Sequence, residues 1–312
     1  MSRYLVLDMG GTYIKYALMN EYAEILEKGR FPAVTNTLEA CLESVAEGTK
    51  QFAGKYEAVA VSMPGRIDTE RGIAHTGGSF QFFNDTPFGA LLEERLGKPV
   101  TLANDGKCAV MAELRTGALR DYQNAAVFVI GTGIGGGIFL NRKVWMGTTG
   151  GAGEFSWLLS NFRAAAEQGL SWGTVGNLIW AHDTSAPGLI RMYAERKNED
   201  PANYTGQSFF EKYDEGDPDA KAALEEFGKI TASGLLTLQA VLDLECYAIG
   251  GGISARSEIT DIIRKCLYDR YEEFPHLPYC RPEIVPCRFG NDANLIGALG
   301  FHLEKTEKSL EQ

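Results

Sequence analysis

The sequence predicts an α/β protein made of two similar half-folds, each with a mostly parallel sheet covered by helices. Short apolar runs alternate with helical patterns along most of the chain. Two of these runs, at residues 4–7 and 125–130, end in sharp turns of glycine and threonine. The repeated strand and turn therefore indicates two related units that bind one ligand from both sides.

The composition is that of an ordinary globular protein. The chain has 312 residues, of which 45% are hydrophobic and 23% charged, so two domains are expected. A formal charge of −11 argues against a protein that binds duplex nucleic acid, which needs a basic face. No apolar run approaches the roughly 20 residues that span a bilayer. Because the first strand begins almost at once, we expect no signal peptide. The six cysteines lack metal-ligand spacing, so a cytoplasmic protein with reduced thiols is expected.

The first half of the chain begins with a strand and its antiparallel partner. Residues 4–8 form an apolar strand, and residues 13–19 alternate as a return strand after the Gly10-Gly11 turn. Thr37 is the expected N-cap of a helix over 38–53, whose apolar residues share one face. The other expected elements are strands at 25–31, 58–63 and 100–103 and helices at 88–96 and 106–120.

The second half repeats this beginning. A strand at 125–130 is expected to pair with 136–141, and residues 145–180, rich in glycine and tryptophan, predict irregular structure that forms a site. Asp217-Pro218 opens a long helix that reaches about residue 244. Strands at 247–249 and 283–285 and helices at 257–271 and 292–303 complete the expected order.

Candidate site residues follow the carboxyl ends of the strands, where open α/β sheets bind ligands. The first group is Asp8-Met9-Gly10-Gly11-Thr12, which is typical of a phosphate-binding hairpin. Gly10 and Gly11 allow close approach of phosphate oxygens to backbone N–H groups, and Asp8 is a candidate to hold Mg²⁺ through water. A tight hairpin that Asp8 merely caps is the alternative.

The second glycine-rich group lies at residues 131–137. Its spacing formally matches a dinucleotide-binding fingerprint, but residues 138–140 continue a strand and do not open a helix, which argues against that reading. A phosphate-binding hairpin is favoured over a glycine-rich hairpin without a ligand, because such glycines are entropically costly.

Asn104-Asp105 is the candidate catalytic group. An aspartate in a phosphotransferase site can accept a hydroxyl proton late in phosphoryl transfer. The alternative is that Asp105 only caps the helix that follows. Glu154, in the loop Gly150-Gly151-Ala152-Gly153, is a candidate to bind ligand hydroxyl groups, or else a solvated loop residue. Gly250-Gly251-Gly252 is either a surface for a flat base or ribose or a simple entry to the next helix. Six aromatic residues are candidates for an apolar wall or for plain packing: Phe80, Phe82, Phe83, Trp145, Trp157 and Trp172.

Taken in order, these motifs resemble the ROK family of repressors, open reading frames and sugar kinases. The resemblance runs from residue 5 to about 298, through Asp-x-Gly-Gly-Thr, Pro-Gly, Asn-Asp, Gly-Thr-Gly-Ile-Gly-Gly-Gly, Ala-Gly-Glu and Gly-Gly-Gly. It implies the duplicated ribonuclease-H-like, actin-like ATPase fold with an interlobe cleft. It also implies a small lobe of residues 1–117 and 291–312, a large lobe of 118–290, and a homodimer.

The resemblance further implies ATP and Mg²⁺ as cofactors and a small-molecule sugar as substrate. Asp105 would be the general base for the sugar hydroxyl, usually the 6-hydroxyl. Gly65, Asn104 and Glu154 would contact the sugar. The residues implied to hold ATP are Gly10, Gly11, Thr12, Gly131, Thr132, Gly133 and Gly251.

The chain departs from many family members where they carry a zinc motif. Trp157 stands at the position of a histidine, residues 170–177 keep glycines but contain no cysteine, and Ile179 stands near a second sugar-binding glutamate. We therefore expect no structural zinc. The pattern is similar to the family's β-glucoside kinases, in which Trp157 would stack on an aglycone or second sugar. The alternative is that Trp157 fills the volume of the missing zinc site.

Other activities remain as alternatives. The main alternative to a β-glucoside kinase is a glucokinase, fructokinase or N-acetylhexosamine kinase of the same family. A sugar-sensing transcriptional regulator is remote, because only three residues precede the first strand and the chain is acidic. A catalytically inactive sugar-binding protein is disfavoured by the presence of both Asp8 and Asp105.

Overall fold

The computed structural model describes residues 2–310, which fall into two compact units. Unit 1 comprises Met1–Arg120, Val144–Ala152 and Asn291–Gln312, and unit 2 comprises Asp121–Lys143 and Gly153–Gly290. The lobes expected from the sequence, 1–117 with 291–312 and 118–290, differ from these units at 118–120 and at Val144–Ala152, which group with unit 1.

The sheet of unit 1 has five strands in the order β3-β2-β1-β4-β7. The central strand β1 pairs antiparallel with β2, as expected from the first turn, and parallel with β4. Strand β3 is antiparallel to β2, and β7 is parallel to β4. The strands are β1 (Arg3–Met9), β2 (Tyr13–Asn20), β3 (Ile25–Pro32), β4 (Ala58–Met63) and β7 (Val100–Asn104), and a separate hairpin joins β5 (Ile67–Asp68) to β6 (Ile73–Ala74).

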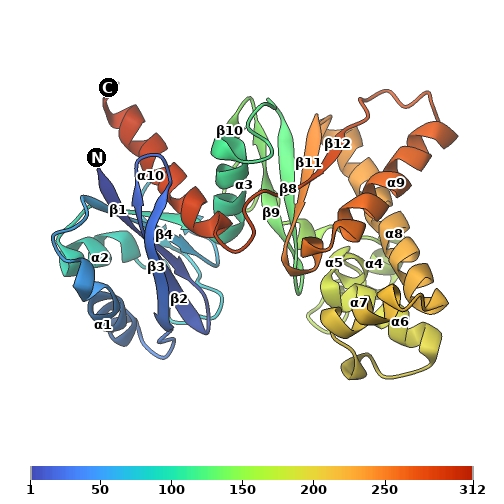
Figure 1. The fold of residues 1–312 in the computed structure, drawn as a ribbon, viewed down its shortest axis with the longest axis horizontal. Helices are drawn as coiled ribbons and strands as arrows, with labels where there is room; N and C mark the ends of the chain where they lie inside the picture. Colours follow the sequence, from blue (N-terminus) through green and yellow to red (C-terminus); the bar gives the residue numbers. More distant parts are fainter. Residues whose placement is uncertain (1, 311–312) are drawn as a thin grey trace. The chain divides into compact units, whose positions relative to one another are not determined.

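Helices cover both faces of this sheet (Figure 1). Leu5 and Leu7 pack in one core with α1 and α2, whereas Asp8 on the opposite face contacts α10. Helix α10 also crosses α3 so closely that a Cβ atom on Gly297 would lie 1.7 Å from the carbonyl oxygen of Cys108, so only glycine fits. The helices are α1 (Leu38–Thr49), the 3₁₀ turn η1 (Lys50–Phe52), α2 (Phe88–Leu96), α3 (Asp105–Thr116) and α10 (Ala293–Leu310).

The sheet of unit 2 has the equivalent order, β10-β9-β8-β11-β12. Its central strand β8 is again antiparallel to the strand that follows it and parallel to β11, which is parallel to β12. This repetition of order and direction confirms that the fold is duplicated. The strands are β8 (Ala125–Ile130), β9 (Ile134–Leu140), β10 (Lys143–Val144), β11 (Cys246–Gly250) and β12 (Glu283–Pro286).

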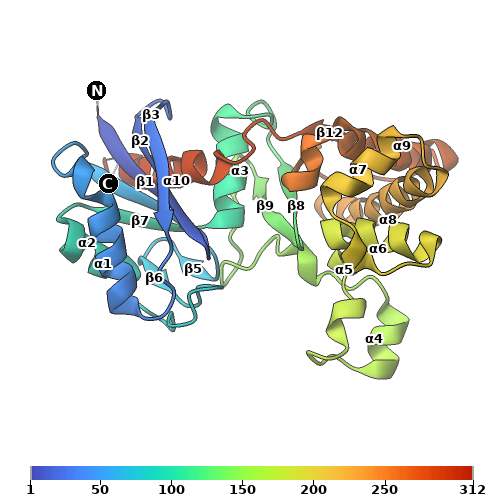
Figure 2. The same cartoon turned by 60° about the horizontal axis from the view of Figure 1, so that its bottom comes forward.

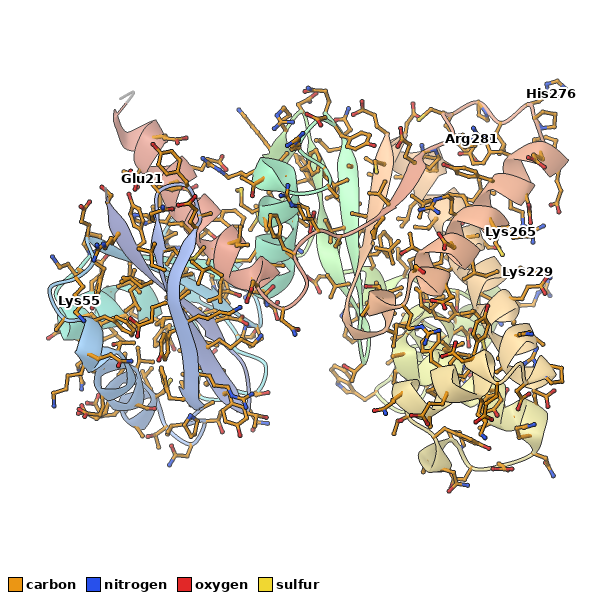
Figure 3. The ribbon with its side chains drawn as sticks, in the orientation of Figure 1. Glu21, Lys55, Lys229, Lys265, His276 and Arg281 are labelled. Atoms are coloured by element: carbon orange, nitrogen blue, oxygen red, sulfur yellow. The ribbon has the colours of Figure 1, made fainter. Side chains whose placement is uncertain are left out.

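The helices of unit 2 pack around the long helix α8. Gly234 on α8 makes room for Trp180, since a Cβ atom there would lie 2.2 Å from the indole ring. Lys229 on α8 and Lys265 on α9 lie on the outer surface (Figure 3), each paired with an acidic residue one turn away. The helices are α4 (Phe162–Gln168), α5 (Ala181–Thr184), α6 (Ala186–Lys197), α7 (Gly206–Asp214), α8 (Pro218–Leu242) and α9 (Ser257–Glu273), with 3₁₀ turns η2 (Phe155–Trp157), η3 (Val175–Asn177), η4 (Pro201–Asn203) and η5 (Gly252–Ala255). Among residues 2–310, no helix is both long and apolar enough to cross a bilayer.

The prediction of mostly parallel sheets was wrong, because β1, β2 and β3 form an antiparallel meander in one sheet and β8 and β9 pair antiparallel in the other. The helix expected at 38–53 gives way to a 3₁₀ turn after Thr49. The helix expected at 106–120 begins one residue earlier and ends at Thr116, where the Glu113 carboxylate accepts a hydrogen bond from the Ala118 N–H group. Helices α6 and α7 were not predicted, although Ser185 and Thr205 cap them in the usual way.

Candidate active site

The carboxyl ends of three neighbouring strands bring the predicted residues of unit 1 together. Asp8 on β1 lies beside Ser62 on β4, and Met63 lies beside Asn104 on β7. The buried thiol of Cys108 is near enough to both carboxylates to feel their charges: burial raises its pKa well above the usual range, and the negative charges of Asp105 and Asp8 raise it further. Asp8 and Asp105 therefore flank the same point of the fold.

Asp8 is buried, and side chains satisfy its carboxylate. Its Oδ1 atom accepts hydrogen bonds from Ser62 Oγ at 3.0 Å and Asn294 Nδ2 at 3.1 Å. Its Oδ2 atom accepts one from Lys15 Nζ at 3.1 Å. The hairpin after β1 is closed by its own backbone, through a hydrogen bond of 3.1 Å from Gly10 N–H to the Tyr13 carbonyl. The alternative that Asp8 caps this turn is therefore wrong, and Lys15 is a site residue that the sequence analysis missed.

The two glycines of this hairpin have close neighbours and no left-handed backbone; Gly10 faces a backbone atom, whereas Gly11 faces the exposed side chain of Ser79. A Cβ atom on Gly10 would lie 2.9 Å from the Tyr13 carbonyl oxygen, and one on Gly11 would lie 2.5 Å from Ser79 Oγ. Gly11 and Thr12 are exposed at the tip of the turn. The turn thus presents bare backbone to solvent, as a phosphate-binding turn requires.

Asn104 and Asp105 have different roles at the start of α3. The side-chain oxygen of Asn104 accepts from Lys107 N–H at 3.1 Å, so Asn104 is the N-cap and Asp105 is the first helical residue. The alternative that Asp105 caps the helix is wrong. The Asn104 amide donates to Asp105 Oδ1 at 3.0 Å and to the Gly65 carbonyl at 2.9 Å. Asp105 is half-buried at a helix N-terminus, which favours its negative charge.

The Gly65 loop has a backbone that only glycine tolerates. Its φ angle is +97°, and a Cβ atom would lie 2.3 Å from the carbonyl oxygen of Thr76. The Arg66 N–H group donates to Thr76 Oγ1 at 2.9 Å and fixes the other side of the loop. Gly65 is therefore held between the β5–β6 hairpin and Asn104.

In unit 2, the glycine-rich turn sits at the carboxyl end of β8. Gly131 N–H donates to the Gly133 carbonyl at 2.9 Å, and Gly131 has no close neighbour that would demand glycine. By contrast, Gly136 has φ +132° and a Cβ atom there would lie 1.9 Å from the Val127 carbonyl oxygen. The strand β9 follows the turn, which confirms that this is not a dinucleotide fingerprint. The fold explains Gly136, whereas Gly131 and the exposed Thr132 are open to a ligand.

The Gly251 turn lies next to the Gly131 turn. Gly251 has φ +99°, and a Cβ atom there would lie 2.2 Å from the carbonyl oxygen of Ile130, so the turn after β11 packs directly on the end of β8. A pocket of about 430 Å³ opens beside it. The pocket is lined by Gly206, Gln207, Phe210, Glu211 and Asp214 from α7 and by Gly252, Ile253 and Arg256. Because α7 was not predicted, its side of this pocket could not be foreseen.

Arg256 is fixed at the edge of this pocket. Its guanidinium group pairs with Asp214 and Glu258, each at 2.6 Å, and lies 4.7 Å from the centre of the Phe210 ring. The hydrogen bonds from these two carboxylates raise the pKa of Arg256 above its usual value. The Phe210 ring therefore forms an aromatic wall of the pocket, and the Arg256 guanidinium over it is neutralised by its two carboxylate partners.

Glu154 and Trp157 lie on one 3₁₀ turn at the surface of unit 2. The Trp157 N–H group donates to the Glu154 carbonyl at 3.1 Å, and both residues are exposed. Phe155 between them is buried and stacks on Phe128 of β8, with ring centres 4.1 Å apart. Ser156 Oγ accepts from Ile134 N–H at 2.8 Å, so the same turn is tied to the glycine-rich hairpin.

The sequence profile of the ROK family matches residues 4–305. A β-glucoside kinase of Klebsiella pneumoniae is 29% identical over 304 residues, which are 97% of this chain and 96% of that protein. A glucokinase of Streptomyces coelicolor is 26% identical over 311 residues, covering 94% of this chain and 95% of the other.

Among solved structures, a ROK family protein of Streptococcus pneumoniae in complex with sucrose superposes with a TM-score of 0.85 at 26% identity. That alignment covers 98% of this chain and 99% of the other. The likeness confirms the actin-like ATPase fold that the motif order predicted. By sequence and by fold, this chain belongs to the ROK family.

Proposed function

We propose that this chain transfers the γ-phosphate of ATP to the 6-hydroxyl group of a hexose or β-glucoside, with a β-glucoside as the favoured acceptor. Membership of a family with many sugar kinases and full-length similarity to two of them support the reaction class. In this proposal the enzyme is a homodimer that acts in the cytoplasm, where ATP is available and thiols stay reduced.

The observation that carries the proposal is the Asp105 carboxylate, which Asn104 orients at the first turn of α3. Asp105 accepts the proton of the sugar hydroxyl as that oxygen bonds to the γ-phosphorus. The bond between the γ-phosphorus and the bridging oxygen breaks, and ADP leaves with the electron pair. Asp105 can act late, when the hydroxyl has become acidic, so it needs no raised basicity.

Backbone turns hold the donor in this proposal. Gly10, Gly11 and Thr12 in unit 1 and Gly131, Thr132 and Gly133 in unit 2 bind phosphate oxygens through N–H groups. The pocket beside Gly251 takes the nucleoside, with Phe210 as a wall for the base.

Asp8 fits a Mg²⁺ ion that is bound through water. Its Oδ1 atom already accepts two hydrogen bonds, whereas Oδ2 accepts one, which leaves an acceptor position for a metal-bound water. Mg²⁺ held there would neutralise phosphate charge. Lys15, paired with Asp8, adds a second positive charge at the same turn.

The acceptor is bound by Gly65, Asn104 and Glu154 in this proposal. The exposed ring of Trp157, one 3₁₀ turn from Glu154, favours an acceptor larger than one sugar ring. The S. pneumoniae protein was solved in complex with sucrose, a sugar of two rings, which supports an acceptor of more than one ring but not a particular linkage. A glucokinase or N-acetylhexosamine kinase is the alternative, because the S. coelicolor relative carries the name glucokinase.

An ADP-release assay with glucose, fructose, N-acetylmannosamine and cellobiose tests the acceptor. We expect the highest kcat/KM with cellobiose. A higher kcat/KM with any free monosaccharide would reject the β-glucoside and favour the corresponding hexokinase.

Replacing Asp105→Asn tests the base. We expect kcat to fall by about 10²- to 10⁴-fold, because the proton has no acceptor, while calorimetric binding of the sugar persists. Asp261→Asn, at a surface carboxylate paired with Arg264, is the matched control and should keep full turnover. Full turnover by the Asp105 variant would refute the proposed base.

A further inference from the structure

Two tryptophans form an exposed corner on unit 2. Trp157 is 52% exposed and Trp172 is 89% exposed, although both rings are large and apolar. Their ring centres lie 6.0 Å apart with the planes at 75°, an edge-to-face contact that leaves a large part of each ring exposed. Exposed apolar surface of this kind costs solvation energy and commonly marks a binding site. We call Trp157 and Trp172 the tryptophan corner.

The segment that carries Trp172 is closed at its base. Ser160 N–H donates to the Leu178 carbonyl at 2.8 Å, and Trp180 N–H donates to the Leu158 carbonyl at 2.6 Å. Between these two bonds the chain forms α4 and η3, and Figure 2 shows α4 set apart from α6–α8. Trp172 is therefore held beside Trp157 by a closed loop and not by the core of the unit.

The corner lies next to the candidate sugar-binding carboxylate. Glu154 is the N-cap of the 3₁₀ turn that carries Trp157 three residues later, and the Trp157 N–H group donates to the Glu154 carbonyl. Phe155 anchors this turn in the core, so its position is fixed. A ligand whose hydroxyl groups reach Glu154 would extend toward the exposed ring of Trp157.

We infer that the tryptophan corner binds the second ring of a β-linked glucoside, with Trp172 as a specificity-determining residue. This inference rests on the proposed function and extends it from the transferred hydroxyl to the acceptor's far end. The axial-hydrogen face of a pyranose and the face of an aryl group are both flat and apolar, so either ring can stack on indole. A single-ring hexose has nothing to place there.

The test compares sugars with one and two rings in the full-length enzyme. Calorimetry gives Kd, and the ADP-release assay gives KM, for glucose, cellobiose and 4-nitrophenyl β-glucoside. Replacing Trp172→Ala should raise Kd and KM at least tenfold for both two-ring ligands and leave the glucose values within twofold. Trp172→Phe should restore most of the affinity, because a flat ring remains.

Phe274→Ala is the matched control. Phe274 is also an exposed aromatic residue of unit 2, at 58%, but lies at the end of α9 and outside the corner. It should change none of the six constants. Loss for the aryl glucoside alone would assign the corner to aryl groups and overturn the sugar-ring assignment.

Three further outcomes would overturn the inference. The first is equal weakening of glucose and cellobiose by Trp172→Ala, and the second is no change in either. The third is conversion of a wild-type dimer to monomer, which would make the corner a contact between copies. If no sugar is phosphorylated but Trp172→Ala still weakens cellobiose binding selectively, the proposed kinase activity is refuted, whereas the inference that the tryptophan corner binds the second ring is kept.

Discussion

In unit 1, substitutions of Asn104 can separate an effect on stability from an effect on activity, because its side-chain oxygen and nitrogen make different hydrogen bonds. The oxygen caps α3 through Lys107 N–H, and the amide nitrogen donates to Gly65 and Asp105. Replacing Asn104→Ser keeps a cap acceptor and removes both donations. Replacing Asn104→Ala removes all three hydrogen bonds.

The expected magnitudes follow from this division. Loss of an N-cap costs about 1 kcal/mol of unfolding free energy. Loss of the donation to the partly buried Gly65 carbonyl costs about another 1 kcal/mol. Asn104→Ser should therefore be less stable than wild type by about 1 kcal/mol, and Asn104→Ala by about 2 kcal/mol. Both variants should lose about tenfold or more in kcat/KM, because Asp105 and the Gly65 loop lose the same positioning bonds.

Urea unfolding followed by far-UV circular dichroism measures the first quantity, and the ADP-release assay measures the second. If the alanine and serine variants are equally stable, Asn104 does not cap α3. If the serine variant keeps wild-type kcat/KM, the bonds to Gly65 and Asp105 do not position the site, and the reasoning about this residue fails.

Two further predictions concern unit 2. Gly251→Ala should destabilise the fold by at least about 2 kcal/mol and weaken ATP binding, because its backbone is left-handed and Ile130 blocks a Cβ atom. Gly252→Ala, with no atom within 4 Å, is its control for stability in the same thermal-shift experiment, and an equal loss of stability would contradict the steric argument. Burial would raise the pKa of Asp217, but hydrogen bonds from Lys197, the α8 backbone and Tyr193 outweigh it and lower the pKa to about 2. The stabilisation that the ionised Asp217 gives the folded state is complete above about pH 4 and is lost as the pH falls toward 2. Asp217→Asn should therefore lower the free energy of unfolding at neutral pH by up to about 2 kcal/mol. It should also make that free energy less dependent on pH in the acid range.

The fold was largely predictable because its strands are short, apolar and followed by strong turn residues. The strand at 58–63 and the helix at 88–96 were predicted at their observed limits, and Thr37 caps α1 as expected. The failures have physical causes. Parallel and antiparallel strands have the same apolar pattern, and α6 and α7 lie in a region whose mixed composition hides their helical period.

The site was predictable as residue types at strand ends, but not as contacts. Lys15 lies on β2 in a polar alternation that gives no sign of its partner, and it finds Asp8 only because the two strands pair in register. Arg256 was invisible for the same reason, since its partner Asp214 comes from a helix 42 residues away in the sequence. Long-range pairing of charges is decided by the fold, which a local pattern cannot reveal.

The glycines show most clearly where sequence reasoning ends. In the sequence, the glycines of 131–137 and 250–252 look alike, and all of them were candidates for ligand contact. In the structure, Gly136 and Gly251 are demanded by carbonyl oxygens of β8, whereas Gly131 and Gly252 have open space where a side chain would go. A glycine that the protein itself does not require is a better candidate for ligand contact than one that it does. Alanine at Gly131 should therefore leave stability nearly unchanged and still weaken ATP binding, whereas alanine at Gly136 should unfold the hairpin, and nucleotide titration beside a thermal melt separates the two.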